Sequence, residues 1–170
     1  MKSMVVRFFG TRTRVASLVA VTALVVMSVG YAADEPPSLE SPVERVFIGE
    51  YDGSEQKYLQ MLPKGLDVDQ PVNALIALHG HGSDRWQFAT QSRDECRAAR
   101  DVAAAHSMVF ISPDYRAKTS WMGPAAEADV VQIIGLLKNQ FLLKRLILCG
   151  GSMGGTAALT FTTRHPQLVD

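Results

Sequence analysis

The sequence has 170 residues, and its seventeen basic and seventeen acidic side chains give a formal net charge of zero. Together with 47% hydrophobic residues, this balance is typical of a globular chain and excludes a disordered or collagen-like one. A chain without net positive charge offers no field that would attract a polyanion, so we expect no nucleic-acid partner. The length predicts a single domain.

The N-terminus has the pattern of an export signal. Four basic residues precede an apolar run from Val15 to Val29, and Gly30-Tyr31-Ala32 supplies small residues of the kind that a signal peptidase recognises. The run has about 15 residues, fewer than the ~20 that a membrane-spanning helix needs. We therefore predict a signal peptide over residues 1–32, with retention as an anchor as the alternative. Cleavage would leave a periplasmic or extracellular protein with no stable membrane span.

The mature chain is expected to begin with a flexible leader, followed by a β-hairpin. Residues 33–42 are polar and rich in proline, so they offer little to pack. Two strand-like runs, Val43 to Gly49 and Gln56 to Leu62, flank Asp52-Gly53, a dipeptide typical of hairpin turns. The folded domain is therefore predicted to span residues 43–170.

From residue 72 onward, short apolar runs alternate with helical patterns. The runs at 72–78, 108–112 and 146–149 are nearly unbroken, as strands covered on both faces must be. The helical stretches between them have apolar faces that should pack on a sheet. In the first, Cys96, Ala99 and Ala103 share a face and Arg93, Arg97 and Arg100 point outward; in the second, the stripe is Ala126, Val130, Ile133, Ile134, Leu137 and Phe141. The predicted fold class is α/β, an antiparallel hairpin followed by a parallel βαβαβα arrangement.

The chain has two cysteines, Cys96 and Cys149. Export would permit a disulfide between them. Cys149, however, ends the apolar run at 146–149, and Cys96 lies in an Arg-rich helical stretch, where each can serve as a small hydrophobic residue. We predict that the two cysteines are unpaired, with a disulfide as the alternative.

The stretch Gly150-Gly151-Ser152-Met153-Gly154 carries the chemistry that the sequence predicts. It contains the pattern Gly-x-Ser-x-Gly, with a strand-like run before it and a helix-compatible run, 156–164, after it. A serine hydroxyl is a weak nucleophile until a base takes its proton, so it must be exposed at a sharp strand-to-helix turn. A Cβ two residues before or after the serine would clash in such a turn, which explains Gly150 and Gly154. The pattern predicts Ser152 as a catalytic nucleophile; glycines that serve only close packing are the alternative.

A second motif, His79-Gly80-His81-Gly82, directly follows the strand predicted at 72–78. With both motifs in this order, the chain resembles the α/β-hydrolase superfamily, and more loosely its secreted esterase and prolyl-oligopeptidase-like branches. The resemblance implies an oxyanion hole formed by the backbone N–H groups of His81 and Met153, with Gly80 and Gly82 as glycines of the loop. In such a site, loss of one donor typically costs about 3 kcal/mol of transition-state stabilisation.

The resemblance also implies a catalytic acid and a catalytic histidine that follow the nucleophile along the chain. Only eighteen residues follow Ser152. His165 lies thirteen positions along the predicted helix, about 20 Å away at 1.5 Å per residue, and Asp170 is the last residue. Since neither can complete a triad, we expect residues 43–170 to form a partial α/β-hydrolase domain, truncated after the helix, that is inactive and poorly soluble by itself. A partner chain that supplies the missing half is the alternative.

Other residues are candidates for supporting roles. We expect the side chains of His79 and His81 to be structural or to contact substrate, with a general base or a metal ligand as the alternative; no carboxylate or cysteine lies at metal-ligand spacing nearby. Asp114 follows a predicted strand and is expected to cap a turn, with a stand-in catalytic acid as the alternative. Trp121 and Met122, in the loop before the second helix, are candidates for lining a substrate pocket, with ordinary packing as the alternative.

The predicted function is hydrolysis of small-molecule carboxylic esters by a serine hydrolase, through a covalent acyl-enzyme on Ser152. This chemistry requires neither a metal ion nor an organic cofactor. Two alternatives stay open: a serine peptidase of prolyl-oligopeptidase-like type that acts on peptides, and an exported binding module that keeps the fold without the chemistry. A nucleotide site is not supported, because the glycines around Ser152 lack the lysine of a P-loop and Gly80-His81-Gly82 lacks the third glycine of a dinucleotide motif.

Overall fold

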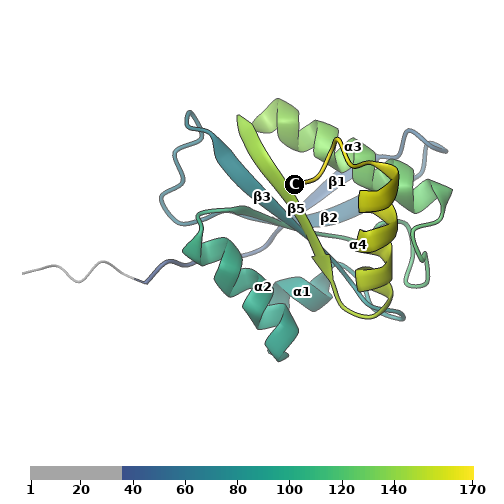
Figure 1. Cartoon of the computed structure of the whole chain (residues 1–170), viewed down its shortest axis with the longest axis horizontal. Coiled ribbons are helices and arrows are strands. Elements are labelled where there is room, and N and C mark those ends of the chain that lie inside the picture. Colours follow the sequence, from purple (N-terminus) through teal and green to yellow (C-terminus); the bar gives the residue numbers. More distant parts are fainter. Residues whose placement is uncertain (1–35) are drawn as a thin grey trace, which may run out of the picture. The chain divides into compact units, whose positions relative to one another are not determined.

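The fold is one mixed β-sheet with helices on both of its faces (Figure 1). The computed structural model describes residues 36–170, so the predicted signal peptide at 1–32 and the start of the predicted leader lie outside the described residues. The described chain contains five strands in the order β1-β2-β4-β3-β5. The predicted fold class, an antiparallel hairpin followed by parallel strands and helices, is confirmed.

The antiparallel hairpin forms one edge of the sheet. β1 (Val43–Ile48) pairs with β2 (Glu55–Met61) along its whole length. In the turn, Gly53 has a φ of 75°, and the Asp52 carboxylate accepts hydrogen bonds from the hydroxyl and N–H groups of Ser54. These hydrogen bonds lower the pKa of Asp52 to about 2. The Asp-Gly dipeptide therefore makes the turn that the sequence predicts.

The parallel strands form the centre and the opposite edge of the sheet. β3 (Val72–Leu78) lies between β4 (Val109–Pro113) and β5 (Leu143–Gly150) and runs parallel to both. β4 also pairs antiparallel with β2, which joins the hairpin to the parallel strands. β3 has its predicted bounds, whereas β5 starts earlier than predicted because Lys144 and Arg145 interrupt its apolar run without ending the strand.

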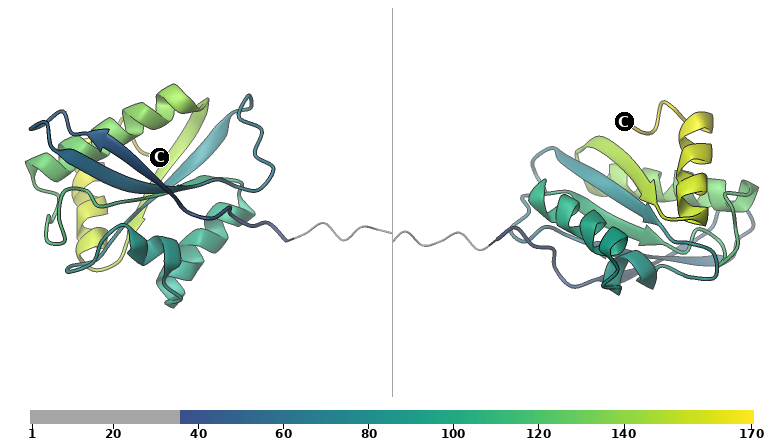
Figure 2. Two further views of the ribbon diagram at one scale, coloured as in Figure 1. Left: turned by 180° about the vertical axis from the view of Figure 1, so that it is seen from behind. Right: turned by 60° about the horizontal axis from the view of Figure 1, so that its bottom comes forward.

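Helices cover the two faces of this sheet in pairs (Figures 1 and 2). α1 (Trp86–Thr90) and α2 (Asp94–Ala105) pack on one face, and α3 (Pro124–Gln140) and α4 (Met153–Arg164) pack on the other. α1 was not expected, because five residues are too few to show a helical period. None of the helices in residues 36–170 has the length and apolar content needed to cross a bilayer.

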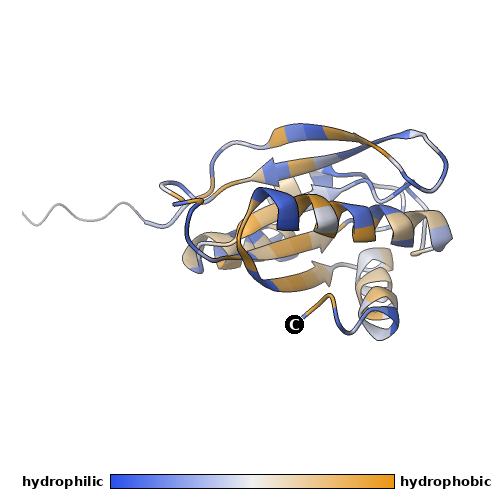
Figure 3. Cartoon of the chain, turned by 90° about the horizontal axis from the view of Figure 1, so that it is seen from above, coloured by the Kyte–Doolittle hydropathy of each residue, from blue (hydrophilic) through white to orange (hydrophobic). Residues whose placement is uncertain are grey.

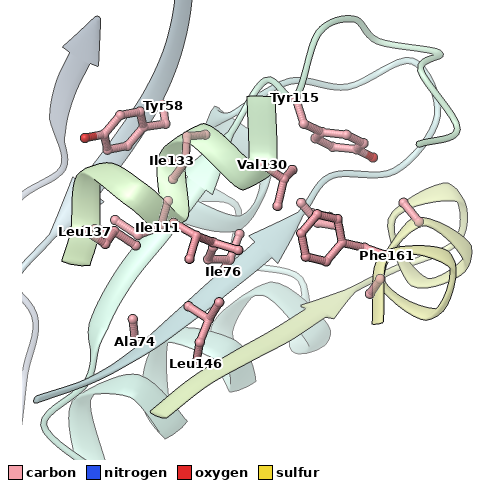
Figure 4. Close-up of a cluster of buried hydrophobic side chains, with 14 of the residues drawn as sticks. Tyr58, Ala74, Ile76, Ile111, Tyr115, Val130, Ile133, Leu137, Leu146 and Phe161 are labelled. Carbon is pink, nitrogen blue, oxygen red and sulfur yellow. The ribbon is translucent and has the colours of Figure 1, made fainter. Parts of the chain in front are cut away.

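Alternate residues of the central strands point into two separate hydrophobic cores. On β3, Ile76 packs with α3 and α4, whereas its neighbours Leu75 and Ala77 pack with α1 and α2. Figure 4 shows Ile76 beneath α3 and near Phe161 of α4. In Figure 3, hydrophobic residues gather along the parallel strands, while the hairpin strands and α3 carry both hydrophobic and hydrophilic residues. The predicted stripe is buried throughout: Ala126, Val130, Ile133, Ile134, Leu137 and Phe141. Burial of one such aliphatic side chain contributes about 1.5–3 kcal/mol.

The two cysteines lie in the core beneath α1 and α2. Cys96 is fully buried, Cys149 is half-buried at the end of β5, and both are free thiols. Burial raises the pKa of Cys149 to about 11 and also raises the pKa of Cys96. At neutral pH both side chains are therefore protonated and pack as small hydrophobic residues.

Two local expectations are not met. Arg100 does not point outward: it is half-buried, and its guanidinium donates to the carbonyl groups of Phe88 and Gln91, which the end of the short helix α1 leaves without partners. The leader predicted at 33–42 is also not free along its whole length. Residues 38–40 pair with residues 62–64 just beyond β2, because an unpaired backbone edge offers hydrogen-bonding groups.

A buried ion pair ties the hairpin turn to α3. Asp129 of α3 is 1% exposed and accepts a hydrogen bond of 2.7 Å from Arg116, which also donates to Asp52 at 2.9 Å. Burial raises the pKa of Asp129, and the positive charge of Arg116 opposes that shift. Arg116→Met would leave a buried carboxylate without a counter-charge. We expect it to lower the free energy of unfolding by about 3–5 kcal/mol at pH 7, as measured by urea denaturation.

The pH dependence of this loss tests its cause. In Arg116→Met, the pKa of Asp129 lies above its ordinary value of 3.8, so the penalty is present above that raised pKa and disappears as the pH falls through it. The double variant Arg116→Met/Asp129→Asn is the control and should recover most of the lost stability. If the loss of unfolding free energy persisted both at low pH and in the double variant, the ion-pair explanation would be contradicted.

Candidate active site

Ser152 lies at a sharp turn between β5 and α4. The strand ends at Gly150 and the helix begins at Met153, so only two residues make the turn. Ser152 is exposed and has a φ of 55° and a ψ of −120°, a conformation that residues with a Cβ seldom adopt. Such backbone conformations cost about 1–3 kcal/mol and persist only where the surrounding structure enforces them. The turn has the shape expected for Gly-x-Ser-x-Gly.

Gly150 and Gly154 are required by the close approach of β5, α4 and β3. A Cβ on Gly150 would lie 2.5 Å from the Gly154 carbonyl carbon and 2.8 Å from the Leu78 oxygen. A Cβ on Gly154 would overlap the Leu78 oxygen and lie 2.8 Å from the His79 oxygen. These distances are shorter than any that real Cβ atoms show. The two glycines therefore let the start of α4 pack directly against the end of β3.

The loop His79–Gly82 lies beside Ser152 because β3 and β5 are parallel neighbours. Leu78 is opposite Gly150 in the register, so the segments that follow the two strands leave the same edge of the sheet. Gly80, His81 and Ser152 consequently line one pocket of about 250 Å³. The tertiary structure thus brings together two motifs that are far apart in the sequence.

Two backbone N–H groups at this site are free to bind an anion. Met153 is the first residue of α4, so its N–H has no intrahelical partner, and the hydrogen bonds found in residues 36–170 include no acceptor for it or for the His81 N–H. The flanking N–H groups are engaged: Gly80 donates to the Gln87 side chain, and Gly82, with a φ of 79°, donates to the Lys118 carbonyl. Free N–H groups beside Ser152 meet the requirement of the oxyanion hole that the sequence predicts.

His79 fixes the loop from beneath. Its buried side chain has Nδ1 2.8 Å from the Gly80 oxygen and Nε2 3.0 Å from the Asp114 oxygen. The Tyr115 hydroxyl donates to the His79 carbonyl at 2.6 Å, and burial raises the pKa of Tyr115, so this hydroxyl stays a donor. Both ring nitrogens of His79 face carbonyl oxygens. The geometry therefore gives His79 a structural function, one of the two expected from the sequence.

Solved structures of esterases and other hydrolases share this architecture. A CE1 ferulic acid esterase from Anaeromyces mucronatus has a TM-score of 0.60 and 16% identity, over 79% of this chain and 57% of the esterase. An S-formylglutathione hydrolase from Agrobacterium tumefaciens has a TM-score of 0.61 and 15% identity, over 78% of this chain and 59% of the hydrolase. The S-formylglutathione hydrolase of Staphylococcus aureus has a TM-score of 0.61 and 18% identity, over 79% of this chain and 57% of the hydrolase. The chain has the α/β-hydrolase fold.

The likeness is one of fold, because the identities are low. The chain spans just under three fifths of the length of these neighbours, with 57% to 59% of each covered. No protein-family model matches the sequence, and no curated protein matches it.

The two side chains predicted to line a substrate pocket, Trp121 and Met122, lie in different environments. Trp121 is 52% exposed, and its ring lies 6.0 Å from the ring of His81 at the pocket wall. Met122 is 5% exposed and packs in the core with α3 and α4. Neither residue lines the pocket that holds Ser152. Trp121 therefore contacts His81 without lining the pocket, whereas Met122 has the ordinary packing that was the alternative.

Asp114 is bound by an arginine. Its carboxylate accepts hydrogen bonds from the Arg85 N–H at 2.9 Å and from the Arg85 guanidinium at 2.8 Å. Arg85 also binds Glu44 at 2.6 Å, and its hydrogen bonds lower the pKa of Glu44. Asp114 thus holds the residues after β4 against the start of α1, and its carboxylate bonds Arg85 rather than the backbone of the turn that it was predicted to cap.

A catalytic base is not placed beside Ser152 by the residues described. In residues 36–170, no hydrogen bond joins the Ser152 hydroxyl to a histidine or a carboxylate. His165 lies 2.7 Å from the Glu127 carboxylate, and Asp170 accepts a hydrogen bond of 2.9 Å from the Leu146 N–H. The same residues also include no cluster of three His, Cys, Asp or Glu side chains that could hold a metal ion.

Four polar pocket residues were not found by the sequence analysis: Ser83, Gln87, Arg93 and Glu95. Ser83 lies just after the loop at His79–Gly82, the other three lie on α1 and around the start of α2, and no motif marks them. Isolated polar residues of this kind form no periodic pattern, so the sequence does not distinguish them from ordinary polar residues on a solvent-exposed surface. Only the packing of α1 and α2 beside the loop at His79–Gly82 places them near Ser152.

Proposed function

We propose that this chain provides the nucleophile and the oxyanion hole of a serine hydrolase that acts on carboxylic esters. The observation that carries the proposal is the strained φ of 55° at exposed Ser152, in a pocket shared with His81 and beside two unpaired backbone N–H groups. Strain at an exposed polar residue is a cost that a purely structural turn would avoid by having glycine there. The esterase and hydrolase neighbours support the same reaction class.

The reaction would proceed through an acyl-enzyme. A general base takes the hydroxyl proton while Ser152 Oγ bonds to the ester carbonyl carbon, and the carbonyl oxygen becomes an anion near the N–H groups of His81 and Met153. The carbonyl re-forms, the alcohol leaves with the proton, and water then releases the acid by the same steps. The start of α4 adds a positive dipole end that favours the anion. Peptide bonds are the alternative substrate, and the signal-like N-terminus suggests action in the periplasm or outside the cell.

Covalent labelling of the intact gene product with a fluorophosphonate tests this proposal. The reagent loses fluoride to an activated serine and leaves a stable phosphonyl group on its oxygen. We expect labelling at one site, on the tryptic peptide of residues 146–164, and fragmentation should place the adduct on Ser152. Heat-denatured protein is the control and should stay unlabelled. Absence of the adduct, or an adduct on another serine, would favour the binding-module alternative or a different nucleophile.

A further inference from the structure

Gln87 is a buried amide on the wall of the pocket that holds Ser152. The residue is 6% exposed, lies on α1, and lines the pocket together with His81 and Ser152. Its Oε1 accepts a hydrogen bond of 2.8 Å from the Gly80 N–H. The position that a Cβ of Gly80 would occupy lies 3.6 Å from this oxygen and 3.5 Å from the Gly151 oxygen. The amide therefore lies next to both segments that form the site.

The Gly80 N–H determines which way this amide points. A backbone N–H can only donate, so the Gln87 oxygen must face it, and the NH₂ group must face elsewhere. Among the hydrogen bonds of residues 36–170, none uses Gln87 Nε2. Nε2 is also not one of the fully buried polar atoms without a partner in these residues, so the NH₂ group is open to the pocket that Gln87 lines and can donate there. A ligand in the pocket would supply the missing acceptor.

The other pocket residues define the chemistry of that ligand. The lining consists of glycines, two serines and polar or charged side chains: Gly80, His81, Ser83, Gln87, Arg93, Glu95, Gly151 and Ser152. No aliphatic or aromatic hydrocarbon side chain belongs to it. A pocket of about 250 Å³ with such walls does not match a long alkyl chain.

We propose that Gln87 Nε2 donates a hydrogen bond to the acyl group of the substrate, and that this selects short acyl groups with an oxygen acceptor over plain alkyl groups. The inference rests on the proposed ester hydrolysis at Ser152. The acyl group is the part that stays attached to Ser152 until water releases it, so it is the part that the pocket must hold. Gln87 would thus have two functions, since its oxygen positions the loop and its NH₂ group recognises the substrate.

A matched pair of esters tests the selection. The methoxyacetate and butyrate esters of 4-nitrophenol have acyl chains of equal length that differ by one ether oxygen in place of a CH₂ group. Each kcat/KM of the intact gene product is divided by the hydroxide-catalysed rate constant of the same ester, which removes intrinsic reactivity. We expect a corrected preference for methoxyacetate of roughly tenfold, the upper range for one hydrogen bond.

Two variants separate the functions of the amide. Gln87→Glu keeps an oxygen acceptor for the Gly80 N–H but removes the donor, whereas Gln87→Leu removes both. We expect the preference to fall to about one in both variants, with Gln87→Glu hydrolysing butyrate faster than Gln87→Leu does. The new charge in Gln87→Glu faces two neutral esters, so its effect cancels in their ratio. If Gln87 only positioned the loop, both variants would keep the preference, and the inference would be overturned.

A second buried glutamine provides the control. Gln60 on β2 is 1% exposed and bonds Arg45 and Gln140, and it does not line the pocket. Gln60→Leu should therefore keep the full preference for methoxyacetate. Wild-type protein that is labelled at Ser152 and hydrolyses both esters without preference would overturn this inference alone. Protein that is not labelled and hydrolyses neither ester would overturn the proposed function and this inference with it.

Discussion

Replacing Ser152 with alanine in the intact gene product is expected to lower kcat for 4-nitrophenyl ester hydrolysis by about a thousandfold or more. The substitution removes the oxygen that forms the acyl-enzyme and leaves the N–H groups of His81 and Met153 in place. Release of nitrophenol at saturating ester measures the effect. An unchanged kcat would mean that the nucleophile is another residue.

The companion variant Ser152→Gly separates chemistry from strain. Glycine adopts a φ of 55° without steric cost, so relief of about 1–3 kcal/mol of strain should exceed the roughly 0.5–1 kcal/mol entropic cost of glycine. We expect the free energy of unfolding to rise by about 1 kcal/mol while hydrolysis is lost. Ser152→Ala keeps the Cβ and should change stability little. A loss of stability in Ser152→Gly would contradict the view that the turn is strained.

Gly154→Ala is expected to lower the free energy of unfolding by about 3 kcal/mol or more and to abolish labelling of Ser152. The added Cβ would overlap the Leu78 oxygen and lie 2.8 Å from the His79 oxygen. These are backbone atoms of β3 and of the loop that follows it, so neither can rotate away. The clash can be relieved only by moving α4 away from β3, which would displace Ser152 and the Met153 N–H together. Denaturant unfolding and fluorophosphonate labelling measure the two effects.

Gly135→Ala is the matched control for this substitution. Gly135 is exposed on α3, and a Cβ there would have no neighbouring atom within 4 Å. Because alanine is favoured over glycine inside a helix, we expect stability to rise by about 0.5–1 kcal/mol. If Gly154→Ala were as harmless as Gly135→Ala, the close approach of α4 and β3 would not be what requires glycine.

The sequence by itself determined the elements whose burial is periodic and the turns whose geometry demands particular residues. β3 has the predicted bounds because a short, nearly unbroken apolar run between Pro71 and His79 is typical of a strand covered on both faces. The face of α3 followed from its apolar spacing, and the hairpin turn followed from Asp52-Gly53. The bend at Ser152 was predicted because Gly150 and Gly154 lie two residues before and after it, where a Cβ would clash in a sharp turn. All of these depend on residues close together in the chain.

The tertiary structure alone decided which of these elements meet. Sheet pairing put β5 beside β3, and so put Ser152 next to the loop at His79–Gly82. The short helix α1, the engagement of Arg100 and the pairing of residues 38–40 depend on backbone groups that find their partners only after the sheet forms. Gln87 is the clearest example. Its place in the sequence gives no sign of function, because its two roles depend on the Gly80 N–H and on a pocket that exists only once strands distant in the sequence have paired.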